Sequence, residues 1–180
     1  MNFYRCLICG ETYMGKDKPS NCPFCGAKEK YMVSAADWVD ENLSIDKLSD
    51  ISRKNLEKAL QLEANNAPFY RDAMMKSRSI EIQGIFKYLS KIEAEHASVV
   101  KKILKCELPE PEKGREVATD DEIENIKASH EREKEATVFY SKFATEAVEP
   151  RVKRVFTALA EIETDHIKLE GGLLNRNALP

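Results

Sequence analysis

The sequence predicts a mainly α-helical protein in which a small metal-binding knuckle domain precedes a four-helix bundle. Two observations support this prediction. Four cysteines form two C-x-x-C pairs near the N-terminus, and from about residue 50 onward apolar residues recur at the spacing of amphipathic helices. We therefore expect a cysteine-rich metal domain at residues 1–34, a linker at 35–50 and a helical bundle at 51–175.

Composition narrows the class of protein. The 180 residues carry a net charge of −3 from interspersed lysines and glutamates, without the basic block that favours binding to nucleic acid or an anionic membrane. The N-terminal segment "MNFYRCLICG" has no export-signal pattern, and no apolar run is long enough to span a membrane. We expect a cytoplasmic protein whose cysteines are metal ligands rather than disulfide partners.

The cysteine pairs are the most specific local motif. They occur as "CLIC" and "CPFC", each followed by a glycine, and comprise Cys6, Cys9, Cys22 and Cys25. Each C-x-x-C turn places two thiolates on one side of a tight loop, so two turns close a tetrahedral S₄ site for zinc or iron. The segment is too short for a core of its own, so the metal must hold it folded. The spacing alone leaves the metal's identity open.

Four long helical patterns follow. We place them at residues 51–76, 80–106, 120–147 and 151–174. A few residues join the first two helices and the last two, so each pair forms an antiparallel hairpin. The middle link has about a dozen residues, which reach roughly 40 Å when extended, about the length of one of these helices. This link allows the lengthwise crossover of a ferritin-like bundle.

The second hairpin repeats the first at an offset of 70 residues. Each half reads E-x₆-Y followed by E-x-x-H, which matches Glu63 with Glu133, Tyr70 with Tyr140, Glu93 with Glu163, and His96 with His166. The glutamates and histidines of this pattern fall on the apolar stripes of their helices, whereas Glu131 and Glu135 fall outside them. Because residues equidistant from a hairpin turn share a level, the inward glutamates meet midway along the bundle.

Inward carboxylates must be neutralised. Each of the four would cost several kcal/mol in an apolar bundle, and no lysine or arginine lies near them on the stripes. Two divalent metal ions would balance the four carboxylates and leave one imidazole for each ion. The i, i+3 spacing of Glu93 and His96 brings both side chains within reach of a single ion. The pattern therefore predicts a dinuclear metal site.

Together the two motifs resemble the rubrerythrin family over nearly the whole chain. The repeat resembles the di-iron bundle of that family, and "CLICGETY…CPFCG" resembles its rubredoxin-like domain. The cysteine domain precedes the bundle, as in the members called reverse rubrerythrins. The resemblance implies two irons in the bundle and one iron, or alternatively zinc, at the cysteine site.

The resemblance also implies residue roles and an activity. The implied roles are bridging ligands for Glu93 and Glu163, terminal ligands for Glu63 and Glu133, capping ligands for His96 and His166, and hydrogen-bond partners for Tyr70 and Tyr140. The implied activity is reduction of hydrogen peroxide to water. An NAD(P)H-linked rubredoxin or flavoprotein reductase would supply electrons through the Fe(Cys)₄ site. A homodimer is also implied, in which the cysteine-bound iron of one chain approaches the di-iron site of the other.

Five residues depart from these patterns or fall outside them. Rubrerythrins usually carry an additional carboxylate three residues after the terminal ligand of the third helix, and this chain has Ala136 there, unless a local bulge turns Glu135 inward. Pro68 should kink the first helix or force a bulge in it. Cys106 is interpreted as a small apolar filler. His130 fits a surface or core histidine better than a residue of the site.

Two other functions fit the same motifs. A ferritin-like ferroxidase or oxygen-reducing protein would carry structural zinc at the cysteine knuckle. A non-enzymatic interaction module would use a zinc ribbon to bind a partner and hold metal in the bundle for structure alone. The metal at the cysteine site separates the peroxidase from both alternatives, and redox cycling in the bundle separates the interaction module from the other two.

Overall fold

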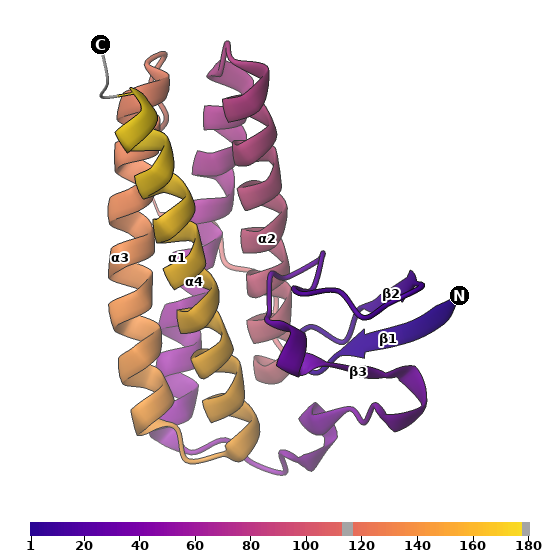
Figure 1. Ribbon diagram of the computed structural model, residues 1–180. Helices are drawn as coiled ribbons and strands as arrows, with labels where there is room; N and C mark the ends of the chain where they lie inside the picture. Colours follow the sequence, from indigo (N-terminus) through magenta and orange to yellow (C-terminus); the bar gives the residue numbers. More distant parts are fainter. Residues whose placement is uncertain (113–116, 178–180) are drawn as a thin grey trace.

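A computed structural model describes residues 1–112 and 117–177 of the chain. Four long helices dominate it (Figure 1), namely α1 (Asp50–Lys76), α2 (Ile80–Leu104), α3 (Glu122–Glu146) and α4 (Pro150–Asn177). α1 with α2 and α3 with α4 form antiparallel hairpins that pack into one bundle, and a small β-module lies against its side. The predicted mainly α-helical bundle with an N-terminal cysteine module is confirmed. None of the helices in the described ranges is both long and apolar enough to cross a membrane.

Polar caps fix where the first three helices begin. The side chains of Ser49, Ser79 and Asp121 accept hydrogen bonds from backbone N–H groups in the first turns of α1, α2 and α3. These N–H groups have no partner within their helix, so each cap contributes about 1 kcal/mol.

α1 continues as one α-helix through Pro68, so of the kink or bulge expected there the bulge does not form, and the kink stays a prediction. The side chains of Phe69 and Tyr70, which follow it, are 0% exposed. Most of the stability of a helix in a protein comes from packing of its apolar face. This packing outweighs the loss of one backbone hydrogen bond at the proline.

The described parts of the link between α2 and α3, residues 105–112 and 117–121, contact α1 at two levels. Gln61 donates a hydrogen bond to the carbonyl of Glu110, and Lys76 donates one to the carbonyl of Ala118. Glu110 thus lies beside the middle of α1 and Ala118 beside its C-terminal end, so the chain advances from Glu110 to Ala118 in the direction of α1. As a result α3 starts beside the turn between α1 and α2, and it runs in the same direction as α2. This is the crossover that the length of the link predicts.

A three-stranded antiparallel sheet frames the cysteine loops. Its strands, in spatial order, are β2 (Thr12–Gly15), β1 (Asn2–Cys6) and β3 (Met32–Ser34). The remaining connection to α1 contains the short 3₁₀ helices η1 (Glu29–Tyr31), η2 (Ala35–Asp37) and η3 (Glu41–Ser44). Trp38 ties this connection to the cysteine loops, because its indole N–H donates to the carbonyl of Cys6 at 3.0 Å.

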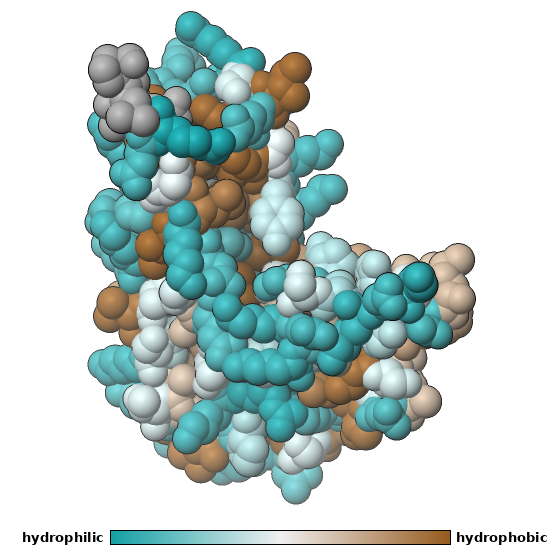
Figure 2. Space-filling view, in the orientation of Figure 1, coloured by the Kyte–Doolittle hydropathy of each residue, from teal (hydrophilic) through white to brown (hydrophobic). Residues whose placement is uncertain are grey.

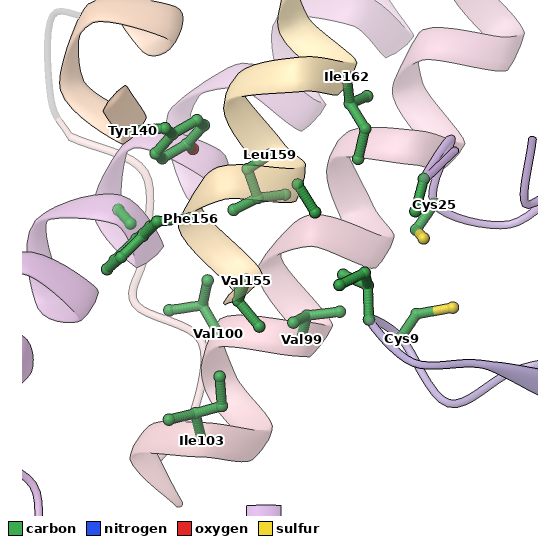
Figure 3. Close-up of a cluster of buried hydrophobic side chains, with 14 of the residues drawn as sticks. Cys9, Cys25, Val99, Val100, Ile103, Tyr140, Val155, Phe156, Leu159 and Ile162 are labelled. Carbon is green, nitrogen blue, oxygen red and sulfur yellow. The ribbon is translucent and has the colours of Figure 1, made fainter. Parts of the chain in front are cut away.

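Apolar packing joins the cysteine loops to the bundle. Figure 3 shows Cys9 and Cys25 beside apolar side chains of α2 and α4, among them Val99, Val155 and Ile162. All five residues are at most 5% exposed and belong to one cluster of buried residues. Full burial of an aliphatic side chain contributes about 1.5–3 kcal/mol. The module is therefore packed onto the bundle of its own chain.

Arg151, at the start of α4, fixes one cysteine loop by hydrogen bonds. Its guanidinium donates to the carbonyl oxygens of Leu7 at 2.5 Å and Ile8 at 2.6 Å, and to Asn42 Oδ1 at 2.9 Å. Arg151 is 6% exposed, so these bonds replace the water that the guanidinium loses on burial. Apolar packing and the hydrogen bonds of Arg151 therefore both hold the cysteine module against the bundle.

Two residues differ from their expected burial. The stripe of the fourth helix predicts that Leu169 points inward, but this side chain is 39% exposed and its neighbour Glu170 is 1% exposed. A helix turns about 100° per residue, so an error of one position moves a side chain from core to surface. Cys106 is exposed rather than an apolar filler, because α2 ends at Leu104 and leaves this cysteine in the link.

We expect Arg151→Ala to lower the free energy of unfolding by about 1–3 kcal/mol, because buried carbonyls of the cysteine loop lose their donor. Urea denaturation of the metal-loaded protein measures the effect. Lys153→Ala, an exposed neighbour on α4, is the matched control and should change stability by less than about 0.5 kcal/mol. Equal midpoints for the two variants would contradict the role given to Arg151.

Two Gly→Ala substitutions should have opposite signs. Gly26 has φ +78°, and a Cβ there would lie 3.0 Å from Ile162 Cγ2, so Gly26→Ala adds both backbone strain and a clash with α4. Gly84 lies in α2 with no neighbouring atom within 4 Å of such a Cβ, so Gly84→Ala should stabilise the protein by about 0.5–1 kcal/mol. Thermal denaturation of both variants checks the pair. A Gly26→Ala protein as stable as wild type would show that the loop does not depend on this contact.

Candidate metal centres

The two cysteine loops bring four thiols together in a geometry that fits one metal ion. Cys6 Sγ lies 3.7 Å from Cys25 Sγ, and Cys9 Sγ lies 3.8 Å from Cys22 Sγ. Disulfide sulfurs are about 2.05 Å apart, whereas a tetrahedral ion with metal–sulfur bonds of about 2.3 Å separates its sulfurs by roughly 3.8 Å. The four side chains are buried. The cluster therefore matches the predicted S₄ site in both spacing and donor type.

The glycine after each pair shapes these loops. Gly10 and Gly26 have φ values of +84° and +78°, a region that side chains other than glycine rarely adopt. Their N–H groups donate to the carbonyls of Cys6 and Cys22 at 3.0 and 2.9 Å, which closes each turn. The Ile8 N–H points to Cys6 Sγ at 3.3 Å. Backbone donors near the sulfurs stabilise the thiolate form that metal binding requires.

The bundle brings the six inward residues to one level, with ligands from all four helices. Their side-chain atoms form two groups in which all atoms lie within 4.8 Å of one another, one made by Glu63, Glu93, His96 and Glu163 and the other by Glu93, Glu133, Glu163 and His166. Each residue is at most 4% exposed. Glu93 and Glu163 belong to both groups, whereas the other four residues belong to one group each.

The two shared glutamates face both histidines. His96 Nδ1 lies 3.7 Å from Glu93 Oε2 and 3.2 Å from Glu163 Oε1. His166 Nδ1 lies 3.8 Å from Glu93 Oε1 and 2.9 Å from Glu163 Oε2. Each of these carboxylates thus presents one oxygen to each histidine. This is the arrangement that two metal ions bridged by two carboxylates need.

A tyrosine from the opposite hairpin holds each remaining glutamate. The Tyr70 hydroxyl of α1 donates to Glu133 Oε1 of α3 at 2.5 Å, and the Tyr140 hydroxyl of α3 donates to Glu63 Oε1 of α1. Both tyrosines are 0% exposed. Each bond uses one lone pair of one oxygen, which leaves the other oxygen free. The tyrosines therefore orient the two glutamates and link the hairpins across the bundle.

Unpaired buried atoms test whether metal fits this centre. Within the described part of the chain, one or both carboxylate oxygens of Glu63, Glu93, Glu133 and Glu163 and the Nδ1 atoms of both histidines have no hydrogen-bond partner. Such atoms are strongly disfavoured when buried. Burial and the nearby charge of Glu93 raise the pKa of Glu63 well above its usual range. Two cations would satisfy these atoms and offset the repulsion, so the residues fit a dinuclear metal centre.

A hydrogen bond connects the two centres directly. His96 Nε2 lies 3.0 Å from the carbonyl oxygen of Cys25. A carbonyl only accepts, so Nε2 carries the proton and Nδ1 keeps its lone pair toward the glutamates. This is the tautomer that a metal-binding histidine requires, with its second nitrogen fixed by a carbonyl. One side of this bond is a residue of the S₄ cluster and the other a residue of the bundle centre.

The residues that flank the centre include one that the sequence interpretation missed. Ala136 is buried, and Glu135 and Glu131 are exposed, so no bulge turns Glu135 inward in α3. The carboxylate buried beside the centre is instead Glu170, which is absent from the predicted set. A search for polar residues one helical turn from each predicted ligand would have found it, because Glu170 follows His166 by four positions.

A pocket reaches the centre at Glu63. It has a volume of about 260 Å³ and is lined mainly by small or apolar residues of α1, α2 and the crossover link, including Ala64, Pro68, Ala94 and Leu108. The pocket gives a molecule of a few atoms a route toward one end of the centre. Pro68 therefore lies in the wall of this pocket.

Comparisons with known proteins agree with this architecture. Over 98% of both chains, the sequence is 28% identical to reverse rubrerythrin-1 of Clostridium acetobutylicum. A hypothetical protein from Pyrococcus furiosus superimposes with a TM-score of 0.59 at 21% identity, covering 69% of this chain and 88% of that one. A two-domain protein from Anabaena variabilis with DJ-1/ThiJ/PfpI-like and ferritin-like domains gives a TM-score of 0.64 at 12% identity, covering 74% of this chain and 42% of that one. At these identities the two structures support the fold alone.

Family models match both parts of the chain. The rubrerythrin model covers residues 54–170, and the model of the rubrerythrin rubredoxin-like domain covers residues 4–32. The first match spans the bundle with both E-x-x-H motifs, and the second spans both cysteine pairs. With the cysteine module preceding the ferritin-like bundle, the chain belongs to the rubrerythrin family.

Proposed function

We propose that this protein reduces hydrogen peroxide to water, with electrons relayed from an NAD(P)H-linked donor through an Fe(Cys)₄ site. The rubrerythrin family is an iron-binding family of oxidoreductases. One observation carries the finer proposal, namely the hydrogen bond from His96 to the Cys25 carbonyl. This bond joins the four-cysteine site, which could accept electrons when it holds iron, to the dinuclear centre of the same chain. In a storage protein with structural zinc at the knuckle, this bond would carry no electrons, because zinc does not change its oxidation state.

The six inward residues would hold two irons in the bundle. Bound iron supplies the change of oxidation state that delivers two electrons to peroxide. Glu93 and Glu163 would bridge the ions, because each faces both histidines. Tyr70 and Tyr140 hold the outer glutamates in place, and this fixed geometry lowers the rearrangement needed during reaction.

Several features of the chain suit a small oxidant. The six residues of the centre are at most 4% exposed, which limits contact between bulk water and the reacting atoms. The pocket at Glu63 leaves room for a molecule of the size of hydrogen peroxide. Figure 2 shows apolar side chains gathered on the bundle face above the cysteine module. This face is available for the homodimer that we include in the proposal.

Reduction of oxygen, with or without iron oxidation, is the second candidate. Ala136 favours it, because this buried residue stands where an additional carboxylate is usual in the family. Without that carboxylate, the preference for peroxide depends on other groups near the centre.

Stopped-flow absorption of the reduced, iron-loaded protein tests the choice of oxidant. We expect limiting hydrogen peroxide to restore the ferric-thiolate and di-iron absorption rapidly and stoichiometrically, and dissolved oxygen to restore it slowly. The reason is that the hydrogen bond between His96 and Cys25 would provide a path for electrons between the two centres, and the pocket beside Glu63 has room for peroxide. A colourless cysteine site, or faster reoxidation by oxygen than by peroxide, would favour the oxygen-reducing alternative.

Removal of one bridging carboxylate should disable the bundle centre. We expect Glu93→Ala to bind fewer than two irons in the bundle and to lose peroxide reduction by at least about 100-fold, more than the loss of an outer-shell partner. Iron analysis and peroxide turnover measure both effects. Glu131→Ala, an exposed carboxylate of α3, is the control and should match wild type. Equal effects of the two substitutions would refute the assignment of the inward face.

A further inference from the structure

Three polar residues form a cluster beside the bundle centre and outside its ligand set. The Ser129 hydroxyl donates to Glu170 Oε1, and His130 Nδ1 lies 3.7 Å from Glu170 Oε2. Ser129 is 0% and Glu170 1% exposed, whereas the His130 side chain keeps 17% of its surface. The cluster thus extends from solvent at His130 to a carboxyl group inside the bundle.

Helix geometry places this cluster next to one end of the centre. Ser129 precedes Glu133 by four residues on α3, and Glu170 follows His166 by four residues on α4, so each lies one turn from a predicted ligand on the same face. The Glu170 oxygens are not among the atoms that converge at the described metal-ligand groups. Glu170 is therefore a neighbour of the centre in this arrangement and not one of its ligands.

The internal repeat shows that the fold does not require these polar residues. At the offset of 70, Ser129, His130 and Glu170 correspond to Ala59, Leu60 and Val100. The first-half residues are at most 3% exposed and form part of the apolar core. An apolar layer therefore packs well at the equivalent level of the same bundle. Replacing such a layer with a buried carboxyl group is unfavourable unless the group has another role.

The cluster has unused hydrogen-bonding capacity. Among the described residues, Glu170 Oε2 and His130 Nδ1 have no hydrogen-bond partner. Burial and the charge of Glu133 raise the pKa of Glu170 to about 9, while Ser129 and His166 act in the opposite direction. Glu163, Tyr70 and His130 also interact with this carboxyl. Burial therefore favours the protonated form of this carboxyl group, whose Oε2 faces His130.

We propose that Glu170 and His130 deliver protons to the buried centre, with Ser129 positioning the Glu170 carboxyl. The inference rests on the proposed function, since H₂O₂ + 2 e⁻ + 2 H⁺ gives 2 H₂O and the protons must reach a centre whose six residues are at most 4% exposed. The electrons come from the reduced protein. The Glu170 O–H bond breaks as its proton passes to the oxygen freed by O–O cleavage. A solvent proton then binds Nε2 of His130 as the Nδ1 proton passes to the Glu170 carboxylate, so the imidazole stays neutral and Glu170 is ready to donate the second proton.

Glu170→Gln tests this step, because glutamine keeps the shape and accepts from Ser129 but cannot donate a carboxyl proton. We expect reoxidation of the reduced, iron-loaded variant by peroxide to slow by at least about tenfold, with unchanged iron content. The control variant Glu131→Gln changes an exposed carboxylate of α3 and should react at the wild-type rate. Wild-type kinetics for Glu170→Gln would overturn the proposal, and loss of iron would overturn it in favour of a ligand role.

A second readout uses the metal-free protein. Infrared difference spectra at neutral pH should show the carbonyl band of a protonated carboxylic acid in the wild type that Glu170→Gln lacks. Equal bands in both proteins would overturn the proposal. The combined variant Ser129→Ala, His130→Leu, Glu170→Val copies the first-half layer and should resist urea at least as well as wild type, whereas a large loss of stability would identify the cluster as structural.

The same experiments distinguish a failure of the peroxidase proposal from a failure of the proton-delivery proposal. If the wild type reacts with oxygen and not with peroxide, the peroxidase proposal fails, but the same comparison made with oxygen still decides on proton delivery, because reduction of oxygen also consumes protons. A slower Glu170→Gln then supports the inference, and an unchanged rate overturns it.

Discussion

Burial of four glutamates and two histidines at one level of the bundle is the constraint on which the rest of the structure depends. Each of these side chains is at most 4% exposed, and isolated carboxylates at such depth would destabilise the fold by several kcal/mol. Their spacing resolves the difficulty, because their unpaired atoms converge in two overlapping groups that suit two cations. The stability of the bundle and its capacity to bind metal are therefore linked.

The same constraint shapes the surroundings of the centre. Tyr70 and Tyr140 each cross to the opposite hairpin, so the two outer glutamates are oriented by residues from the other half of the repeat. His96 is oriented by the carbonyl of Cys25, which belongs to a different module. The bundle centre is thus complete only when both hairpins and the cysteine module are packed together.

Packing of the cysteine module follows from a small number of close contacts. Gly26 allows the loop to approach Ile162, and Arg151 binds the carbonyls of the other loop. Both contacts lie within a single chain. Within one chain, the hydrogen bond of His96 joins the S₄ cluster to the bundle centre, and the approach between chains that the resemblance implies stays a prediction.

Much of this architecture follows from the sequence by itself. The two C-x-x-C pairs, the offset of 70 residues and the period of the apolar stripes predict the fold class and bring the cysteines and the Glu and His residues of both halves to their two sites. These features are local or periodic, so spacing alone determines which side chains share a loop or a helix face. The tertiary structure decided the rest. The bond between His96 and Cys25 joins residues 71 positions apart, the continuity of α1 at Pro68 depends on packing, and the inward position of Glu170 in place of Leu169 depends on the rotation of α4 against α3. Such contacts depend on how whole elements pack against one another, and the sequence of either partner does not specify that arrangement.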